Sequence, residues 1–322
     1  MPEVSRVIEG FSESVVIVRD ARSAADNWLQ LSGWAERHQG AVPGSLLRAW
    51  GLADTCAGRE VVLQQQDAVA GRLRLIELAG CEQEDIRPNP QTWDCGALLD
   101  LNVRVADMGQ RQREFRAANW RGPSDPVAWR FGEVKVSEWL AMGEDGLAVA
   151  LIERLSPPLP DDQLPDSVGP VFNSSQVVAD MAVSLAFYEQ VLGFDKFLHI
   201  RQPLLDAPGE NPLGIPHNLV SELDVEIAIL SPGGSMDGSV ELIKMHGLEG
   251  RQFAARSRPP NLGLLGLRFP VQDAAALAQR LAGEGVEIPF APTTLAFAPY
   301  GSVLMFAARA PEGAWLEFYQ LL

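Results

Sequence analysis

Residues 175–194 read SQVVADMAVSLAFYEQVLGF, and their pattern predicts the basic folding unit of the chain. It begins with a short apolar run, reaches Asp180, continues with apolar residues at helical spacing and stops at Gly193. An aspartate at a helix start accepts the free amides of the first turn, and a glycine suits the left-handed position just past a helix end. The pattern therefore predicts a strand, a capped helix and a chain reversal.

The same pattern occurs in the first half of the chain. Residues 15–34 read VVIVRDARSAADNWLQLSGW, and when Asp20 is placed on Asp180 an aromatic residue follows eight positions later and a glycine thirteen positions later in both copies. Weaker copies begin at residues 101–107 (LNVRVAD) and 267–273 (LRFPVQD), each followed by a helical pattern. Strand-rich sequence follows every helix. The chain is therefore predicted to be an α+β protein of four βαβββ modules.

A segment rich in proline divides the chain nearly in half. Residues 155–167 read LSPPLPDDQLPDS, and proline interrupts both helices and central strands. We expect an N-terminal domain over residues 8–155, a linker over residues 156–167 and a C-terminal domain over residues 168–322. A four-stranded sheet with one helix leaves a face uncovered, so the modules must pair and enclose a curved cleft. The sequence leaves two pairings open: in chain order, or exchanged so that the first module packs on the fourth.

Composition limits the partners of the protein. The 322 residues include 26 Lys and Arg against 42 Asp and Glu, for a net charge of −16. Such a surface repels nucleic-acid backbones and anionic bilayers, so neither is expected as a partner. No apolar run is long enough to span a membrane, and residues 1–18 lack a secretory pattern. With three cysteines and no CxxC spacing, we expect a cytoplasmic protein that binds a small molecule, as a monomer of two domains or a homodimer.

The four modules resemble the vicinal oxygen chelate superfamily, which contains glyoxalases, bleomycin-resistance proteins and extradiol dioxygenases. The resemblance covers nearly the whole chain and is best at VVADMAVSLAFYEQVLGF (residues 177–194) and APEGAWLEFYQ (residues 310–320). It implies two glyoxalase-like domains with curved mixed sheets. It does not fix the reaction, because the superfamily hosts isomerases, lyases, dioxygenases, epimerases and plain binders on one scaffold.

The resemblance also implies two kinds of metal-ligand position in each module. One lies on the first strand, seven residues before the helix-start aspartate, and the other lies on the last strand. In this sequence the first-strand positions are Glu13, Asp100, Asn173 and Gly266, and the last-strand positions are Glu77, Ala150, Glu241 and Glu317. None is a histidine, the usual ligand of catalytic iron or zinc, so an extradiol dioxygenase is not expected.

Carboxylates at these positions suit a hard divalent cation such as Mg, Mn or Ca, although the sequence makes no cofactor certain. The metal candidates are Glu13, Glu77, Glu241 and Glu317. Pairing in chain order would group Glu241 and Glu317 with Asn173. Exchanged pairing would group Glu13, Glu77 and Glu317 instead, and would leave Glu241 with Asp100 and Asn173.

A structural role for these acids is the alternative to metal binding. On an alternating strand Glu77 shares a face with Leu73 and Leu75, and Glu241 shares a face with Ile243. A charge on an apolar face is costly unless it is paired, and an arginine on a neighbouring strand would supply the partner. Glu13 lies near the amino terminus, where solvation is the simpler interpretation.

The expected function is catalysis on a small carbonyl or aromatic compound, of the isomerase or lyase type. Burial raises the pKa of a carboxyl group, so Glu241 or Glu317 is expected to act as the general base, with Asn173 donating to the enolate. The alternative is a metal-free protein that sequesters a small molecule, as bleomycin-resistance proteins do. Residues 202–216 are interpreted as either a lid or a surface loop, and the arginines of residues 246–261 as either an anion site or paired surface charges.

Overall fold

A computed structural model describes residues 7–160 and 167–322 of the chain. These residues form the four predicted modules, each with a strand, a helix and three further strands. The first comprises β1 (Glu13–Val18), α1 (Ala21–Ser32), β2 (Ala35–Ala41), the short α2 (Gly44–Ala49), β3 (Ala57–Gln64) and β4 (Arg72–Ala79). The second comprises β5 (Asp100–Val105), α3 (Met108–Ala117), β6 (Val127–Phe131), β7 (Val134–Met142) and β8 (Ala148–Ser156).

The second half of the chain repeats this order. The third module comprises β9 (Val168–Val177), α4 (Met181–Ala186), which continues as a π-helical segment (Phe187–Val191), β10 (Asp195–Pro203), β11 (Asp224–Ser231) and β12 (Ser239–His246). The fourth comprises β13 (Gly263–Pro270), α5 (Ala274–Gly283), β14 (Phe290–Phe297), β15 (Gly301–Arg309) and β16 (Trp315–Leu321).

The predicted helix signals form as expected. The side chain of each helix-start aspartate accepts hydrogen bonds from one or two backbone amides of the first turn, at Asp20, Asp107, Asp180 and Asp273. A cap of this kind stabilises a helix by about 1 kcal/mol. Gly33, which ends α1, has a φ of 69° and adopts the left-handed conformation that glycine allows without steric cost.

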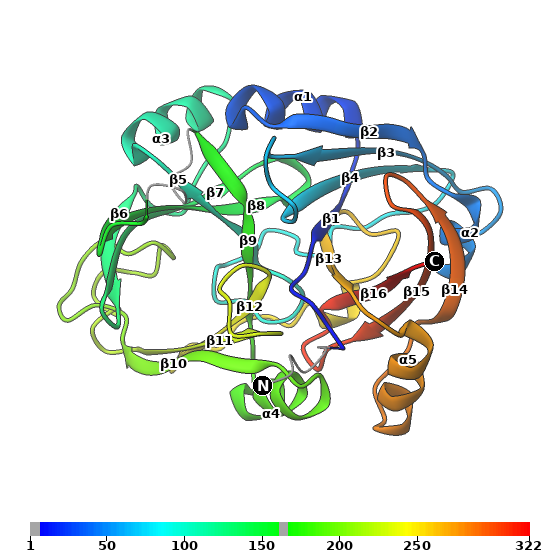
Figure 1. Ribbon diagram of the computed structural model, residues 1–322. Helices are drawn as coiled ribbons and strands as arrows, with labels where there is room; N and C mark the ends of the chain where they lie inside the picture. The colour runs from blue at the N-terminus through cyan, green and yellow to red at the C-terminus, as the bar shows by residue number, and fades with distance from the viewer. Residues whose placement is uncertain (1–6, 161–166) are drawn as a thin grey trace.

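The strands form two eight-stranded sheets, and each sheet combines two modules. The first sheet, in the order β14-β15-β16-β13-β1-β4-β3-β2, joins the fourth module to the first. The second sheet, in the order β10-β11-β12-β9-β5-β8-β7-β6, joins the third module to the second. The joins are antiparallel pairs, β1 with β13 and β5 with β9. Of the two arrangements that the sequence leaves open, the structure has the exchanged one (Figure 1).

Each sheet therefore takes strands from both halves of the chain. The predicted boundaries at residues 155 and 168 separate the two sequence repeats, and they do not separate the two sheets. The division into two domains at these residues stays a prediction. The centre of the expected linker, residues 161–166, lies outside the described residues.

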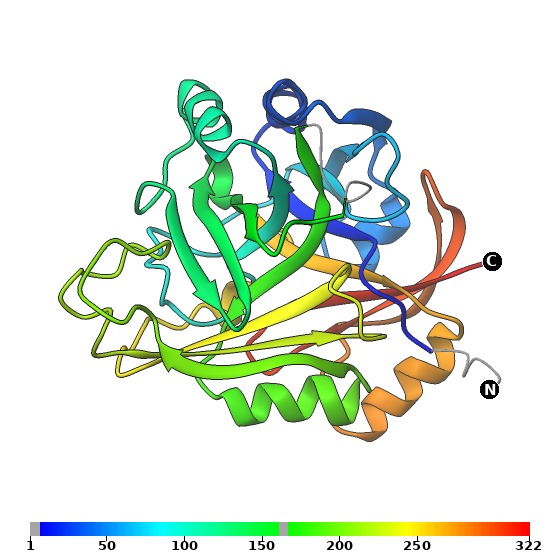
Figure 2. The same ribbon diagram turned by 60° about the vertical axis from the view of Figure 1, so that its left-hand side comes forward.

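The helices cover the outer faces of the curled sheets. Helices α1 and α3 lie side by side, and α4 and α5 lie together on the opposite side of the molecule (Figures 1 and 2). Between α1 and α3 the ring of Trp28 lies 5.3 Å from that of Trp34, 6.2 Å from Phe115 and 6.1 Å from Trp120. This aromatic cluster joins the first and second modules on the outer sides of the two sheets.

Candidate functional site

The inner side of the first sheet, which we name the first hollow, is filled by a network of charged side chains. Arg74 on β4 contacts Glu13 (Nε to Oε1, 2.7 Å) and Glu60 (Nη1 to Oε2, 2.8 Å). Arg268 on β13 contacts Glu13 (Nη1 to Oε1, 2.6 Å) and Glu317 (Nε to Oε2, 2.6 Å). All five residues are at most 1% exposed. The network therefore connects strands of the first and fourth modules through buried ion pairs.

The guanidinium groups of Arg74 and Arg268 neutralise Glu13 and Glu317. These guanidinium groups also lie over the Phe297 ring, at 4.3 Å for Arg74 and 4.6 Å for Arg268. Burial acts to raise the pKa of Glu13, but the charges of Arg74 and Arg268 outweigh it and lower the pKa to about 2. The expectation of a metal at Glu13 and Glu317 is corrected accordingly, and so is the expectation that Glu13 is solvated.

Glu77 lies on the opposite face of β4 from Arg74. Its Oε2 accepts a hydrogen bond from the backbone amide of Ala21 at the start of α1 (3.3 Å), and its Oε1 accepts one from Arg59 Nη2 (2.8 Å). Side chains three positions apart on a strand point to opposite faces, which explains the separation. Glu77 therefore supports the start of a helix and does not join Glu13 and Glu317 in the first hollow, contrary to the expectation for exchanged pairing.

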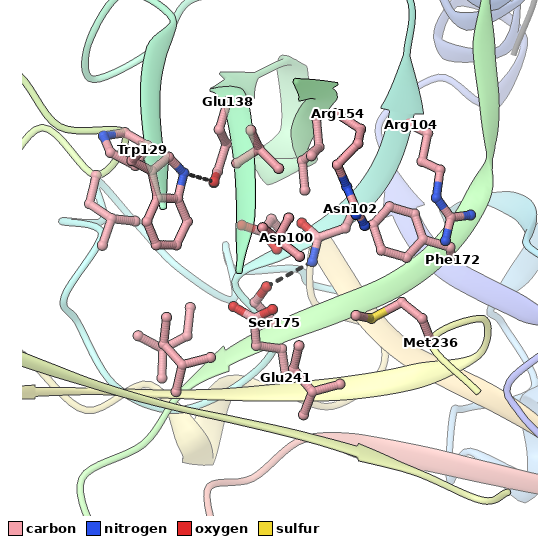
Figure 3. Close-up of a pocket in the computed structure, with 18 of the residues that line it drawn as sticks. Asp100, Asn102, Arg104, Trp129, Glu138, Arg154, Phe172, Ser175, Met236 and Glu241 are labelled. Carbon is pink, nitrogen blue, oxygen red and sulfur yellow. Dashed lines mark hydrogen bonds between the residues drawn. The ribbon is translucent and has the colours of Figure 1, made fainter. Parts of the chain in front are cut away.

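The inner side of the second sheet, which we name the second hollow, contains a cavity (Figure 3). Its wall is mostly apolar and includes Val225, Ile227 and Ile229 of β11 and Ile243 of β12. The cavity measures about 80 Å³. That is roughly half the volume of an apolar cavity that holds benzene, so the cavity suits a small compound better than a large aromatic one.

Three carboxyl groups from three strands line this cavity. Asp100 begins β5, Glu138 lies on β7 and Glu241 lies on β12. Asp100 is 4% exposed, whereas Glu138 and Glu241 keep some accessible surface along the cavity that they line. Trp129 Nε1 donates a hydrogen bond to Glu138 Oε2 (2.7 Å). Ser175 donates hydrogen bonds to the Asp100 carboxyl group, whereas its buried Oδ1 has no hydrogen-bond partner among the described residues.

Burial raises the pKa of all three groups. The pKa of Asp100 rises to about 6. The pKa of Glu138 rises to about 7, because the charge of Asp100 adds to the effect of burial. The pKa of Glu241 rises to about 8, because both Asp100 and Glu138 add to it. The cavity therefore holds an ionised and a protonated carboxyl group together near neutral pH, which is the arrangement that acid and base catalysis requires.

The donor groups do not fit the predicted divalent cation. Within residues 7–160 and 167–322, no three side chains of the His, Cys, Asp or Glu type are arranged to hold a metal ion. Glu241 is also separated from the other three predicted ligands, since Glu13 and Glu317 lie in the first hollow and Glu77 lies against α1. The described residues therefore do not form the predicted site for Mg, Mn or Ca.

Asn173 lies behind the cavity wall. It is fully buried, its Nδ2 donates to Ser239 Oγ (2.6 Å) and its Oδ1 accepts from Asn102 Nδ2 (2.6 Å). Asn102, not Asn173, lines the cavity. The predicted catalytic group of Glu241, Glu317 and Asn173 is thus not brought together, because the exchanged pairing places Glu317 in the other sheet.

The segment 202–216 and the β6–β7 hairpin both lie at the cavity. Leu204, Pro212 and Leu213 of the segment 202–216 form part of its wall, so this segment covers the second hollow. Trp129, on the β6–β7 hairpin, forms another part. Both segments come from modules that face each other across the second sheet.

Comparison with known proteins agrees with this architecture. Residues 171–318 match the Glyoxalase/Bleomycin resistance protein/Dioxygenase superfamily. This match places residues 171–318, in the second half of the chain, in the superfamily. Glyoxalase I from Zea mays has a similar fold, with a TM-score of 0.60 and 13% identity over 97% of this chain and 92% of that one. A putative dioxygenase from Bacillus subtilis is also similar, with a TM-score of 0.59 and 10% identity over 98% of this chain and 86% of that one.

The structural likenesses at this level of identity establish the glyoxalase-like fold in tandem and leave the reaction open. No curated protein matches the chain by sequence. In the part of the chain that the structure describes, no helix combines the length and the apolar character needed to cross a bilayer.

The superfamily resemblance does not point to Glu138, because it implies ligand positions only on the first and last strands of a module, and Glu138 lies on β7. A signal was present. Glu138 lies on the same face of β7 as Val134 and Val136, and all three line the cavity. The rule that singled out Glu241, an acid on an apolar strand face, applies equally to Glu138.

Proposed function

We propose that the chain is an enzyme of the glyoxalase superfamily that acts on a small carbonyl compound by acid and base catalysis, of the isomerase or lyase type. The observation that carries the proposal is the group of Asp100, Glu138 and Glu241 in one cavity, with raised pKa values and no ion-pair partner among the described residues. Ordinary structural acids are paired, as Glu13 is in the first hollow.

The three acids divide into a base and a donor. Asp100 has the lowest pKa of the three and an unpartnered oxygen, so its carboxylate takes the proton from a carbon next to the substrate carbonyl. The electron pair of that C–H bond moves toward the carbonyl oxygen to give an enolate. Protonated Glu241 donates a hydrogen bond to the enolate oxygen and stabilises the charge. The amide of Asn102 is less suited to this task, because it already donates to Asn173 and Ser175.

The fate of the enolate decides between the two reaction types. Return of the proton from Asp100 to a different carbon gives an isomerised product. Loss of a leaving group from the next carbon, with Glu138 or Glu241 supplying its proton, gives an unsaturated product and a lyase. Ring cleavage of the extradiol type is not part of the proposal, because the carboxylate at the corresponding last-strand position, Glu317, is bound to Arg268.

The test is proton exchange. Wild type, Asp100→Asn and Glu241→Gln are incubated in D₂O with hydroxyacetone, pyruvate and 2-oxobutyrate, and ¹H NMR follows loss of the protons next to the carbonyl. The proposal predicts faster exchange with wild type than in buffer and a loss of about 100-fold or more in Asp100→Asn, which lacks the base. The loss in Glu241→Gln should be smaller, because the glutamine amide still donates a hydrogen bond to the enolate oxygen. Exposed Glu133, on the turn of the β6–β7 hairpin, provides the control variant Glu133→Gln, which should match wild type. Exchange no faster than in buffer for every compound, or equally fast in the variants, would refute catalysis.

A second candidate function is sequestration of a small molecule without turnover. The apolar wall and Trp129 favour it. It predicts saturable binding in wild type with no exchange, unchanged affinity in Glu241→Gln and weak affinity in Trp129→Ala. In either case we propose that the protein works in the cytoplasm on a small molecule, as a monomer or homodimer.

A further inference from the structure

A row of alternating residues leads from the acids of the second hollow to two arginines. Asp100, Asn102 and Arg104 alternate along β5, so all three point to the inner side, and all three line the cavity. Arg154 lies on β8, the strand that pairs with β5 in parallel, and it also lines the cavity. Figure 3 shows Arg104 and Arg154 close together on one side of the cavity, across from Trp129 and Glu138.

Arg104 is held in place by its neighbours. Its Nη1 lies 3.0 Å from Asp237 Oδ1, and its guanidinium group lies 4.2 Å from the centre of the Phe172 ring. Phe172 belongs to β9, which pairs with β5, so the strand next to β5 fixes the position of the arginine. Asp237 is largely exposed and balances the positive charge of Arg104, but not that of Arg154.

Arg154 forms no hydrogen bond or ion pair with any residue in the described ranges. It is partly buried, and burial together with the nearby charge of Arg104 lowers its pKa. A partly buried cation beside another cation is unfavourable unless an anion joins them. Acids are abundant in this chain, and two arginines of residues 246–261 form ion pairs with them: Arg251 pairs with Asp94 and Arg256 pairs with Glu84.

The positions of the charges orient a ligand in the cavity. An anionic group is attracted to Arg104 and Arg154 and repelled by the ionised carboxylate of Asp100. A planar carboxylate matches the fork of a guanidinium group and fits the small cavity, whereas the carbon chain would lie along the apolar wall. We propose that Arg104 and Arg154 form a carboxylate-binding subsite and that the substrate is a small oxo acid with its carbonyl group toward the three acids.

This inference rests on the proposed function only for the carbonyl part of the ligand, so it is tested by binding and not by turnover. Isothermal titration calorimetry measures the affinity of wild type for pyruvate and 2-oxobutyrate, with the uncharged amide pyruvamide as the matched ligand. We expect the carboxylates to bind wild type about tenfold or more tighter than the amide. Arg154→Gln should remove that difference by weakening the carboxylates alone.

The control is Arg113→Gln, because Arg113 is an exposed arginine of α3 outside the cavity. It should bind the carboxylates within about twofold of wild type. Thermal unfolding adds a second readout: removal of an unpaired cation beside Arg104 should leave the melting temperature of Arg154→Gln unchanged or raise it, whereas removal of a structural arginine would lower it.

Several results would overturn the subsite. These are carboxylate and amide bound equally by wild type, no saturable binding of either carboxylate, or an Arg154→Gln protein that binds the carboxylates as wild type does. Inorganic phosphate that binds as tightly as the carboxylates would overturn the assignment to a carboxylate. Tight carboxylate binding without proton exchange would support the subsite and refute the proposed catalysis, so the two failures are distinguishable.

Discussion

Arg74 and Glu13 form an ion pair that is entirely closed to water, with Arg74 Nε 2.7 Å from Glu13 Oε1 and both side chains 0% exposed. The two residues belong to β4 and β1, and Arg268 of β13 extends the pair into the fourth module. The first hollow is thus a structural centre, and the second hollow, whose acids lack such partners, is the candidate active site.

Removal of Arg74 should destabilise the protein strongly. Arg74→Met leaves Glu13 and Glu60 buried without their guanidinium partner, and we expect a loss of about 3–5 kcal/mol in the free energy of unfolding. Urea denaturation measures the loss. The matched control is Arg59→Met, since Arg59 forms an exposed pair with Glu77 and should contribute less than about 1 kcal/mol. Equal stability of the two variants would contradict a structural role for the network.

The stability of the protein should fall as pH rises through the range in which the acids of the second hollow ionise. Their pKa values are raised in the folded state, so the native protein binds more protons than the unfolded chain between about pH 4.5 and pH 8. Glu241→Gln should therefore stabilise the protein by about 1–3 kcal/mol at pH 9 and have little effect at pH 4. Urea denaturation at both pH values measures the difference. A variant that is less stable than wild type at pH 9 would mean that the ionised carboxylate is well solvated or paired.

Turnover should depend on pH with a maximum between about pH 6 and pH 8. The base, Asp100, is ionised above a pKa of about 6, and the donor, Glu241, is protonated below a pKa of about 8. Measurement of kcat/KM for proton exchange across this range gives the profile. Glu241→Gln retains a hydrogen-bond donor that cannot ionise, so its residual activity should no longer fall on the alkaline side. A profile that is flat from pH 5 to pH 9 in wild type would exclude this assignment of roles.

Trp129 should tune the ionisation of Glu138. Its Nε1 donates to Glu138 Oε2, and this hydrogen bond favours the charged carboxylate. Trp129→Phe keeps an aromatic ring in the wall and removes the donor, so the pKa of Glu138 should rise above about 7. Carboxyl ¹³C NMR titration of the variant measures it, with Trp139→Phe as the comparison because Trp139 donates to the Ser124 carbonyl instead. An unchanged or lower pKa in Trp129→Phe would show that the hydrogen bond has no such effect.

The repeat predicts the modules well because its signals are local. Asp20 and Asp180 begin helices, and strands follow them, since capping and periodicity act within one module. The pairing of modules is different in kind. It depends on which first strands meet, and here β1 pairs with β13 and β5 pairs with β9. More than two hundred residues separate β1 from β13 in the sequence. Each module carries the same local signals, so no local feature distinguishes the two arrangements.

The site was predictable in part for a related reason. Glu241 stands out as an acid on an apolar strand face, and the structure places it in the cavity. Glu13 and Glu317 stand out equally, but their partners, Arg74 and Arg268, come from neighbouring strands whose register is a property of the folded sheet. The alternation of residues along a strand does not predict the position of Glu77, because both faces of β4 are buried and only one of them lines a hollow.

The central claim is that the second hollow keeps three carboxyl groups partly protonated at neutral pH. Carboxyl ¹³C NMR titration of protein labelled at Asp and Glu tests it most directly, with Asp100→Asn, Glu138→Gln and Glu241→Gln to assign the signals. We predict three resonances with midpoints near pH 6, 7 and 8, each lost in one variant. Midpoints near pH 4 for all three groups would contradict the claim.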